Sequence, residues 1–410
     1  MVGGICLYYD IEPLREELVR SLDVTKAVDD DEIYHRIDEL ILSLSKKEYI
    51  SLNKKSYLQK ELFNSIRKLD VLQELIEDET ITEIMVNGKK NIFIERDGAI
   101  VKLNKEFTSK EKLEDVVQQI VAKCNRTVNE STPMVDARLE NGDRVNIILP
   151  PVAINGPILT IRRFPKEPIG MEHLLKWGSI TQEAAEFLRV LVMSGYNIFI
   201  SGGTGSGKTT FLNALSAYIP KDERVITIED NAELQILNIE NLVKLESRNA
   251  NVEGENEITI RDLIKSALRM RPDRIIVGEI RGKESLDLLQ ALCTGHSGSI
   301  STGHANSAAD MLSRIETMVL MGMDLPLQAI RRQITSGIDI LIHLGRLRDK
   351  SRKVLEILEI MGMEEGEIVT NPLYMFKEEE HQKGEKVIGS LEKINPLYHR
   401  TKLLLSGNEV

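Results

Sequence analysis

The chain has 410 residues, too many for one ordinary hydrophobic core, so we expect two or three domains. Hydrophobic residues make up 42% and charged residues 29%, a globular composition that excludes a disordered or fibrous chain. The formal net charge is -11, and no long cluster of lysine and arginine offsets it. This balance disfavours DNA binding as the main function, and a local basic patch is the remaining way in which the chain could bind nucleic acid.

The start of the chain, MVGGICLYYDIEPLREE, lacks the cationic segment, apolar core and cleavage site of a signal peptide. The longest apolar-rich run, FLRVLVMSGYNIFI, is interrupted well short of the roughly 18 residues that a membrane span needs. We therefore expect a cytoplasmic protein without a transmembrane segment. Cys6, Cys124 and Cys293 form no CxxC pair, which fits a reducing compartment and offers neither a disulfide frame nor a zinc site.

Residues 1–69 are expected to form an N-terminal helical segment. Pro13 fits a first helical turn, and three aspartates at 29–31 precede an apolar stripe at helical spacing. A second stripe follows, and the two consist of Ile33, Ile37, Leu40, Ile41 and Leu44, then Leu58, Leu62, Ile66 and Leu69. They are most simply the inward faces of a small bundle, with a partner-binding face as the alternative.

Residues 70–165 change to an α+β pattern, and residues 166–180 are expected to be a linker because FPKEPIG holds two prolines and a glycine. Residues 81–88 and 91–98 are expected as strands, and residues 112–124 as an amphipathic helix. Residues 136–149 are expected to form two strands around an Asn141-Gly142 hairpin.

Between residues 181 and 345, apolar strand-like runs alternate with helical segments, which predicts an α/β domain with a mostly parallel sheet covered on both faces. The expected strands are YNIFISG, RVITIED, DRIIVGE, GSISTGH and IDILIHLG. Residues 346–410 are charge-rich and are expected to extend this domain, with KEEEHQKGEK as a solvated turn and KVIGSLEKI as one more strand.

The segment GGTGSGKT fits the pattern G-x-x-x-x-G-K-[ST] and lies between an expected strand and an expected helix. Glycines let backbone N–H groups curl around a phosphate chain, and the helix N-terminus adds its dipole. Lys208 is expected at the β and γ phosphates of ATP, and the Thr209 hydroxyl on Mg²⁺. The nucleotide-binding residues, beginning after Gly202, are Gly203, Thr204, Gly205, Ser206, Gly207, Lys208, Thr209 and Thr210.

Two carboxylate sites stand at the ends of expected strands, where parallel sheets bind ligands. Glu279 follows Gly278, which replaces the aspartate that usually ends a Walker B strand, and Glu279 is the first candidate to orient or activate the attacking water. Glu229 is expected to hold Mg²⁺ through water, with Asp230 shaping the loop. A plain surface carboxylate is the alternative for each.

The segment TGHSGSISTGHANS places His296 and His304 on either side of a small expected strand, and period two would put both on one face. A metal site built on these two histidines would need a further ligand, and no cysteine or third histidine lies nearby in the sequence. We therefore expect His304 to sense the γ-phosphate and His296 to be a coupling or interface residue of the nucleotide site, against a structural role for either.

Together, the boxes GGTGSGKTT, ITIEDNAEL, MRPDRIIVGEIRG and TGHSGSISTGHANS, in this order, resemble the type II/IV secretion ATPase superfamily. ESTPMVDARLENGDRVNIILPP and RIETMVLMG make the chain similar to the CpaF-type branch, which powers Tad/Flp pilus assembly. The resemblance runs from about residue 30 to the carboxyl end. Residues 1 to about 28 have no counterpart in it, and Gly303 stands where a larger residue is common.

The resemblance implies a homo-hexamer, a RecA-like motor domain that uses ATP and Mg²⁺, and membrane platform proteins as partners. It also implies a preceding PAS-like domain whose arginines clamp the nucleotide, here Arg138, Arg144 and Arg162. Planar cations suit the charge that develops on a transferred phosphoryl group. A two-residue turn would pair Arg138 with Val145 and put Arg138 and Arg144 on opposite faces, so only one of them would reach the nucleotide unless the turn is longer or a bulge intervenes. We favour Arg144 and Arg162, with Arg138 in an interdomain contact and an ordinary surface arginine as the alternative for each.

The leading hypothesis is therefore a cytoplasmic ATPase that pushes on a membrane-embedded pilus or secretion platform. A nucleic-acid motor with the same core would need a basic pore, which the acidic balance disfavours. A scaffold gated by nucleotide, with negligible turnover, is the third hypothesis.

Overall fold

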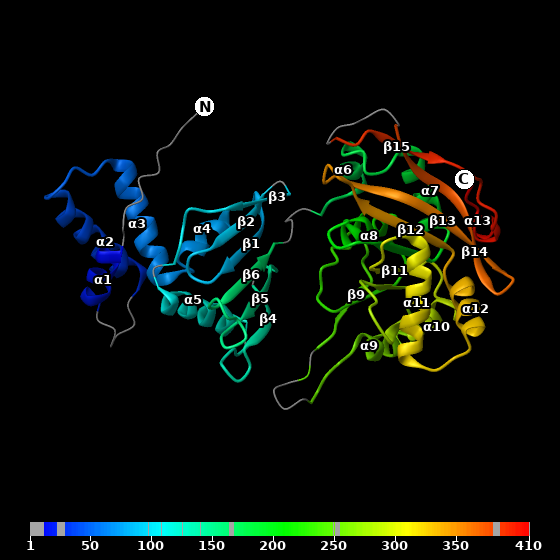
Figure 1. Ribbon diagram of the computed structural model, residues 1–410, viewed down its shortest axis with the longest axis horizontal. Coiled ribbons are helices and arrows are strands. Elements are labelled where there is room, and N and C mark those ends of the chain that lie inside the picture. The colour runs from blue at the N-terminus through cyan, green and yellow to red at the C-terminus, as the bar shows by residue number, and fades with distance from the viewer. Residues whose placement is uncertain are drawn as a thin grey trace. The chain divides into compact units, whose positions relative to one another are not determined.

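The computed structural model describes residues 12–22, 29–96, 98–107, 109–124, 126–139, 141–163, 168–248, 250, 255–379 and 386–409. The chain divides into two compact units, Met1–Pro165 and Lys166–Val410, each with its own hydrophobic core (Figure 1). Within the described ranges, no helix has both the length and the apolar character needed to cross a bilayer.

The first unit begins with helices α1 (Glu12–Ser21), α2 (Asp30–Ser45), α3 (Leu52–Arg67) and α4 (Val71–Glu77). Asp29 caps α2 by accepting a hydrogen bond from the Glu32 N–H, and Ser51 caps α3 in the same way. The two predicted stripes, except Leu69, share one buried cluster with residues of α1, including Leu18, whereas Leu69 belongs to the core of the following sheet. The predicted helical bundle is therefore confirmed.

A six-stranded sheet follows among the described residues, antiparallel throughout, in the order β3-β2-β1-β6-β5-β4. Its strands are β1 (Ile81–Asn87), β2 (Ile92–Arg96), β3 (Ala99–Lys102), β4 (Met134–Arg138), β5 (Arg144–Ile148) and β6 (Ile158–Arg162). Helix α5 (Lys110–Lys123) buries its apolar stripe against one face, so the alternate residues of each strand lie on the other.

The turn between β4 and β5 differs from the predicted two-residue hairpin. The Leu139 N–H donates to the Asp143 carbonyl at 2.9 Å, and Arg138 lies directly opposite Arg144. Gly142 adopts φ +92°, and the buried Asp143 carboxylate pairs with Arg163 at 3.5 Å, which anchors the longer loop. The prediction that Arg138 and Arg144 occupy opposite faces was wrong, because one extra loop residue shifts the register by one.

The second unit is built on a nine-stranded sheet in the described ranges, in the order β15-β14-β13-β12-β7-β11-β10-β8-β9. Six neighbouring strands run parallel, which confirms the predicted mostly parallel sheet, although β9 was not among the five expected strands. They are β7 (Ile198–Gly202), β8 (Val225–Glu229), β9 (Leu242–Glu246), β10 (Arg274–Val277), β11 (Ile300–Gly303) and β12 (Ile340–Arg346).

Helices cover both faces of this sheet. One apolar cluster holds α6 (Met171–Lys176), α7 (Gln182–Met193), α8 (Lys208–Ser216) and α13 (Thr401–Ser406). The other holds α9 (Ile260–Ala267), α10 (Glu284–Leu292), α11 (Ala308–Gly322) and α12 (Leu327–Gly337). Residues 166–180, expected as a linker, contain α6, whose Met171 and Leu174 belong to the first cluster.

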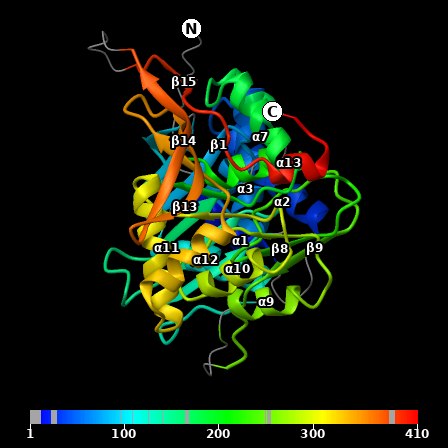
Figure 2. The same cartoon turned by 90° about the vertical axis from the view of Figure 1, so that its right-hand side faces the viewer.

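The sheet continues beyond β12 in antiparallel strands β13 (Arg352–Glu364), β14 (Glu367–Glu378) and β15 (Gly389–Lys393). Figure 2 shows β13 and β14 as a long twisted hairpin. Only β15 was predicted from the sequence, because β13 and β14 show no regular alternation of buried and exposed residues. The predicted turn at residues 377–386 falls largely outside the described residues.

Candidate active site

The glycine-rich loop joins β7, buried along its whole length, to α8. A Cβ at Gly202 would lie 2.5 Å from both the Leu344 carbonyl oxygen and the Ser206 Oγ, so only glycine fits. Gly205 and Gly207 adopt φ +71° and +95°, in the region that favours glycine. Strand, loop and helix thus form a cradle of the kind that binds phosphate at a helix N-terminus.

The remaining residues of the loop differ in exposure. Gly203 and Thr204 are exposed and Ser206 is buried, whereas Thr209 and Thr210 are half-buried on the first turn of α8. The exposed backbone at Gly203 and Thr204 leaves the end of the cradle open to a ligand.

Lys208 is almost entirely buried, with an exposed fraction of 7%. Its ammonium donates to the carbonyls of Gly202 at 3.0 Å and Gly203 at 3.1 Å, and its Nζ lies 3.1 Å from His304 Nδ1. These contacts satisfy a buried cation and hold its tip over the loop.

His304, just after β11, connects Lys208 to Glu279. Its Nε2 lies 2.7 Å from Glu279 Oε1. Because an ammonium can only donate, we assign Nδ1 as the acceptor from Lys208 and place the ring proton on Nε2, on the side of Glu279, which makes the imidazole neutral. The approach of Nε2 to Glu279 Oε1 is a close polar contact without hydrogen-bond geometry. Burial lowers the pKa of His304, with Glu279 opposing and Lys208 reinforcing that shift. The site therefore favours the neutral, bridging imidazole.

Arg281 holds the other side of the Glu279 carboxylate. It donates from Nη2 to Glu279 Oε2 at 2.7 Å, and its Nη1 lies 3.6 Å from Asp230 Oδ2. The hydrogen bond to Glu279 raises the pKa of Arg281. Sequence reasoning missed this residue, although its position two residues after Glu279, on the same loop, was a usable signal.

Glu229, at the end of β8, is buried with an exposed fraction of 4%. Its Oε2 accepts hydrogen bonds from the Glu233 N–H at 2.7 Å and the Leu234 N–H at 2.9 Å. Among the residues the structure describes, its Oε1 has no hydrogen-bond partner. Burial raises the pKa of Glu229 to about 7 although both N–H groups oppose the shift.

Gly278 explains how Glu229 fits. A Cβ at Gly278 would lie 3.0 Å from Glu229 Cγ, tighter than ordinary contact. The glycine that replaces the usual Walker B aspartate therefore makes room for the Glu229 side chain.

The donors near the loop fit a magnesium ion. Glu229 offers a buried, unpartnered oxygen, and Thr209 offers a hydroxyl at the helix start. In the described part of the chain, no group of three or more His, Cys, Asp and Glu side chains could hold a metal by itself. Mg²⁺ commonly uses one or two protein ligands, substrate phosphates and water, which suits this sparse set.

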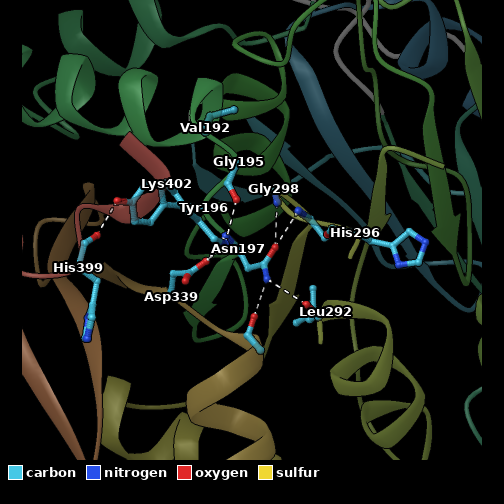
Figure 3. Close-up of polar contacts among 12 residues, drawn as sticks. Val192, Gly195, Tyr196, Asn197, Leu292, His296, Gly298, Asp339, His399 and Lys402 are labelled. Carbon is cyan, nitrogen blue, oxygen red and sulfur yellow. Dashed lines mark hydrogen bonds and ion pairs between the residues drawn. The ribbon is translucent and has the colours of Figure 1, made fainter. Parts of the chain in front are cut away.

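The structure does not bring His296 to this site. His296 precedes β11 and His304 follows it, so neither histidine belongs to the strand and the two lie at its opposite ends. The period-two argument for a shared face therefore does not apply to them. Asn197 fixes the His296 loop by accepting from the N–H groups of Gly298 and Ser299. Figure 3 shows the His296 imidazole pointing away from Asn197, and its Nδ1 lies 3.2 Å from the Ala291 carbonyl oxygen.

The three predicted arginines belong to the first unit, where one row across the sheet contains them all. Arg138 lies opposite Arg144, and Arg144 lies opposite Arg162. Glu83 lies opposite Arg162 on the next strand, β1. Burial raises the pKa of Glu83 and Arg162 opposes that shift. Since opposite residues of antiparallel strands share a face, the arginines form one cationic row on the face away from α5.

Comparison with known proteins gives a consistent set of relatives. A putative conjugal transfer protein of Mycobacterium tuberculosis (strain H37Rv) is 33% identical over 304 residues, covering 73% of this chain and 86% of that protein. The conjugal transfer protein TrbB of Rhizobium radiobacter is 33% identical over 325 residues, covering 77% of this chain and 96% of that protein.

The fold has a solved counterpart in the ATPase DotB of Yersinia pseudotuberculosis. That structure matches with a TM-score of 0.52 and 17% identity, covering 70% of this chain and 77% of that one. The profile of the family described as Type II/IV secretion system protein matches residues 66–388. With its glycine loop, Glu279 and His304 in one site, this chain belongs to the type II/IV secretion system protein family.

Proposed function

We propose that this chain is an ATPase that hydrolyses ATP to drive assembly or transport through a secretion system. The observation that carries the proposal is the connected series Lys208, His304 and Glu279 at the mouth of the phosphate cradle. The family, that of type II/IV secretion system proteins, and the relatives, which are conjugal transfer proteins, support the same class of function.

In the proposed reaction, water attacks the γ-phosphorus of ATP and the bond to the β–γ bridging oxygen breaks. The bonding electron pair stays on ADP, and the water proton is released as inorganic phosphate forms. Glu279 orients or accepts the proton of the water, and Lys208 neutralises charge on the β and γ phosphates. His304 stays beside Glu279 through Nε2. When ATP binds, Lys208 moves from His304 Nδ1 to the phosphates, and Nδ1 must then gain a proton before it can donate to a γ-phosphate oxygen.

Magnesium supplies charge neutralisation on the phosphates when it is bound. Thr209 and Glu229 are the residues that would hold it. Because the Glu229 carboxyl has a pKa raised to about 7, it must lose its proton fully to serve as a ligand, and that requirement links magnesium affinity to pH.

The finer part of the proposal concerns assembly. We place the chain in the CpaF-type branch, as a homo-hexamer on the cytoplasmic side of a membrane platform that builds Tad/Flp pili. Arg144 and Arg162 would clamp the nucleotide, and their position in one row with Arg138 lets all three serve a single anion. An arginine supplied in this way is worth about 10³ to 10⁵ in rate.

The test is Mg²⁺-dependent ATP turnover by purified protein, with ATP binding measured separately by calorimetry. We expect Lys208→Ala to lose binding and turnover, and Glu279→Gln to keep binding while turnover falls by about 10² or more. Glu186→Gln removes an exposed carboxylate that pairs with Arg189 on the same helix, α7, and it should match the wild type.

Two outcomes would contradict the proposal. ATP binding without turnover, with or without platform membranes, would favour a nucleotide-gated scaffold. Stimulation of turnover by DNA would favour a nucleic-acid motor.

A further inference from the structure

We propose that a polar pocket beside the glycine loop receives the inorganic phosphate that leaves after ATP hydrolysis, and that Arg314 is its main contact. The proposal rests on the proposed ATPase function and adds a product site to it. Arg314 is the first residue of the segment RIETMVLMG.

The pocket lies wholly within the second unit and has a volume of about 650 Å³. It begins at Gly203 and Thr204 of the glycine loop, passes His304 and Arg281, and continues along α11 to Met321. It therefore opens at the end of the cradle where Lys208 and His304 meet, which is the expected position of the γ-phosphate.

Three cationic or potentially cationic side chains line the pocket, and two of them are engaged elsewhere. His304 bridges Lys208 and Glu279, and Arg281 pairs with Glu279 and Asp230. Arg314 is exposed, and within the described residues its guanidinium makes no hydrogen bond or ion pair. Arg314 is also close enough to His304 to help lower its pKa.

The lining favours an anion over a cation. Among the described residues that line the pocket, Asp310 has the one carboxylate beside the guanidinium groups of Arg281 and Arg314, and the other polar lining groups include Asn306, Ser313 and Thr317. Hydroxyl and amide groups can donate to phosphate oxygens, and the planar guanidinium matches two of those oxygens at once. An unpaired guanidinium at the end of a phosphate cradle is therefore suited to a tetrahedral oxyanion.

The position of the pocket gives an order to product release. ADP remains on the glycine loop through its β-phosphate, whereas the free phosphate is next to Thr204 and His304, with the pocket as a path outward. Arg314 would draw the phosphate from the Lys208 end of the cradle, which lets His304 return to its contact with Lys208.

The test measures inorganic phosphate itself as the probe, by phosphorus NMR titration of ADP-loaded protein and by product inhibition of ATP turnover. Arg314→Gln should weaken phosphate binding and raise the inhibition constant about tenfold, the loss expected for one charge-assisted contact. Arg314→Lys should give a smaller loss because it keeps the charge without the planar fork. Arg269→Gln is the matched control, because Arg269 is also exposed and does not line the pocket.

The outcomes separate the two proposals. Weaker phosphate binding in Arg314→Gln but not in Arg269→Gln, with unchanged thermal unfolding in both, would support the product site. Equal phosphate binding in Arg314→Gln and the wild type would overturn it, even if ATP turnover is normal. Phosphate binding that depends on Arg314 in a protein without ATP turnover would support the anion site and refute the ATPase proposal.

Discussion

Replacing Glu229 with glutamine tests the electrostatics of the site without any ligand. The buried carboxyl has a pKa raised from 4.5 to about 7, mainly by burial, so the folded state favours the protonated form. One pKa unit corresponds to about 1.4 kcal/mol, and the full effect is therefore about 3 kcal/mol. In Glu229→Gln the new amide oxygen could still accept from the Glu233 and Leu234 N–H groups, so the substitution removes mainly the titration.

The sign follows from proton linkage. Below pH 4.5 the carboxyl is protonated in both the folded and unfolded states, so its raised pKa does not change the free energy of unfolding. As pH rises toward the folded pKa of about 7, the unfolded chain releases the proton first, so folding loses stability; above that pH the loss is constant. Between about pH 5.5 and about pH 8, this one group should lower the free energy of unfolding by about 2 kcal/mol.

The assay is urea unfolding followed by the fluorescence of Trp177, the only tryptophan of the chain, which lies in the second unit with Glu229. The wild-type free energy of unfolding should fall by about 2 kcal/mol more than that of Glu229→Gln between the two pH values. The lowered pKa values of His304 and His343 affect both proteins alike and cancel in the comparison. An identical pH dependence in the two proteins would refute this account of Glu229.

Three further substitutions probe the other parts of the site. Gly278→Ala should lower the free energy of unfolding by about 1–3 kcal/mol in urea, because its Cβ would crowd Glu229, whereas Gly282→Ala has only a 3.4 Å contact and should be near neutral. His304→Ala should reduce the ATP turnover number about 10²-fold while ATP binding by calorimetry persists, and equal loss of binding would contradict its positioning role. Arg162→Gln should slow ATP turnover about 10³-fold in a coupled assay, and wild-type turnover would remove Arg162 from the clamp.

The sequence predicted those parts of the fold that depend on local pattern. The central strands of the second unit are short apolar runs that end at polar residues, so β7, β8, β10, β11 and β12 were all predicted. The helix caps at Asp29 and Ser51 and the stripes behind them likewise follow from local chemistry. The β13–β14 hairpin was missed because its partners are specified by pairing across the sheet rather than by its own alternation.

The candidate site was predictable in its residue types and less so in its contacts. The sequence places Lys208, Glu279 and His304 at the ends of parallel strands, but it does not reveal that His304 bridges the other two. The glycine at position 303 is likewise explained only by a contact in the folded chain. A Cβ at Gly303 would lie 2.9 Å from Met311 Cε, so the methionine side chain occupies the space that a larger residue would need. Such pairs join residues whose proximity exists only after folding.

The row of arginines in the first unit supports an anion site by an argument independent of resemblance. Like charges placed directly opposite each other in a sheet reduce its stability, and here Arg138, Arg144 and Arg162 occupy adjacent positions across three strands. Glu83 lies opposite Arg162 on the next strand, and Arg138 Nε donates to the Gly142 carbonyl at 3.1 Å. A register shift of one residue at Gly142 would separate Arg138 from Arg144. The longer turn, anchored by Asp143, therefore keeps the three arginines in one row on one face of the sheet, and a polyphosphate bound at that face would meet all three.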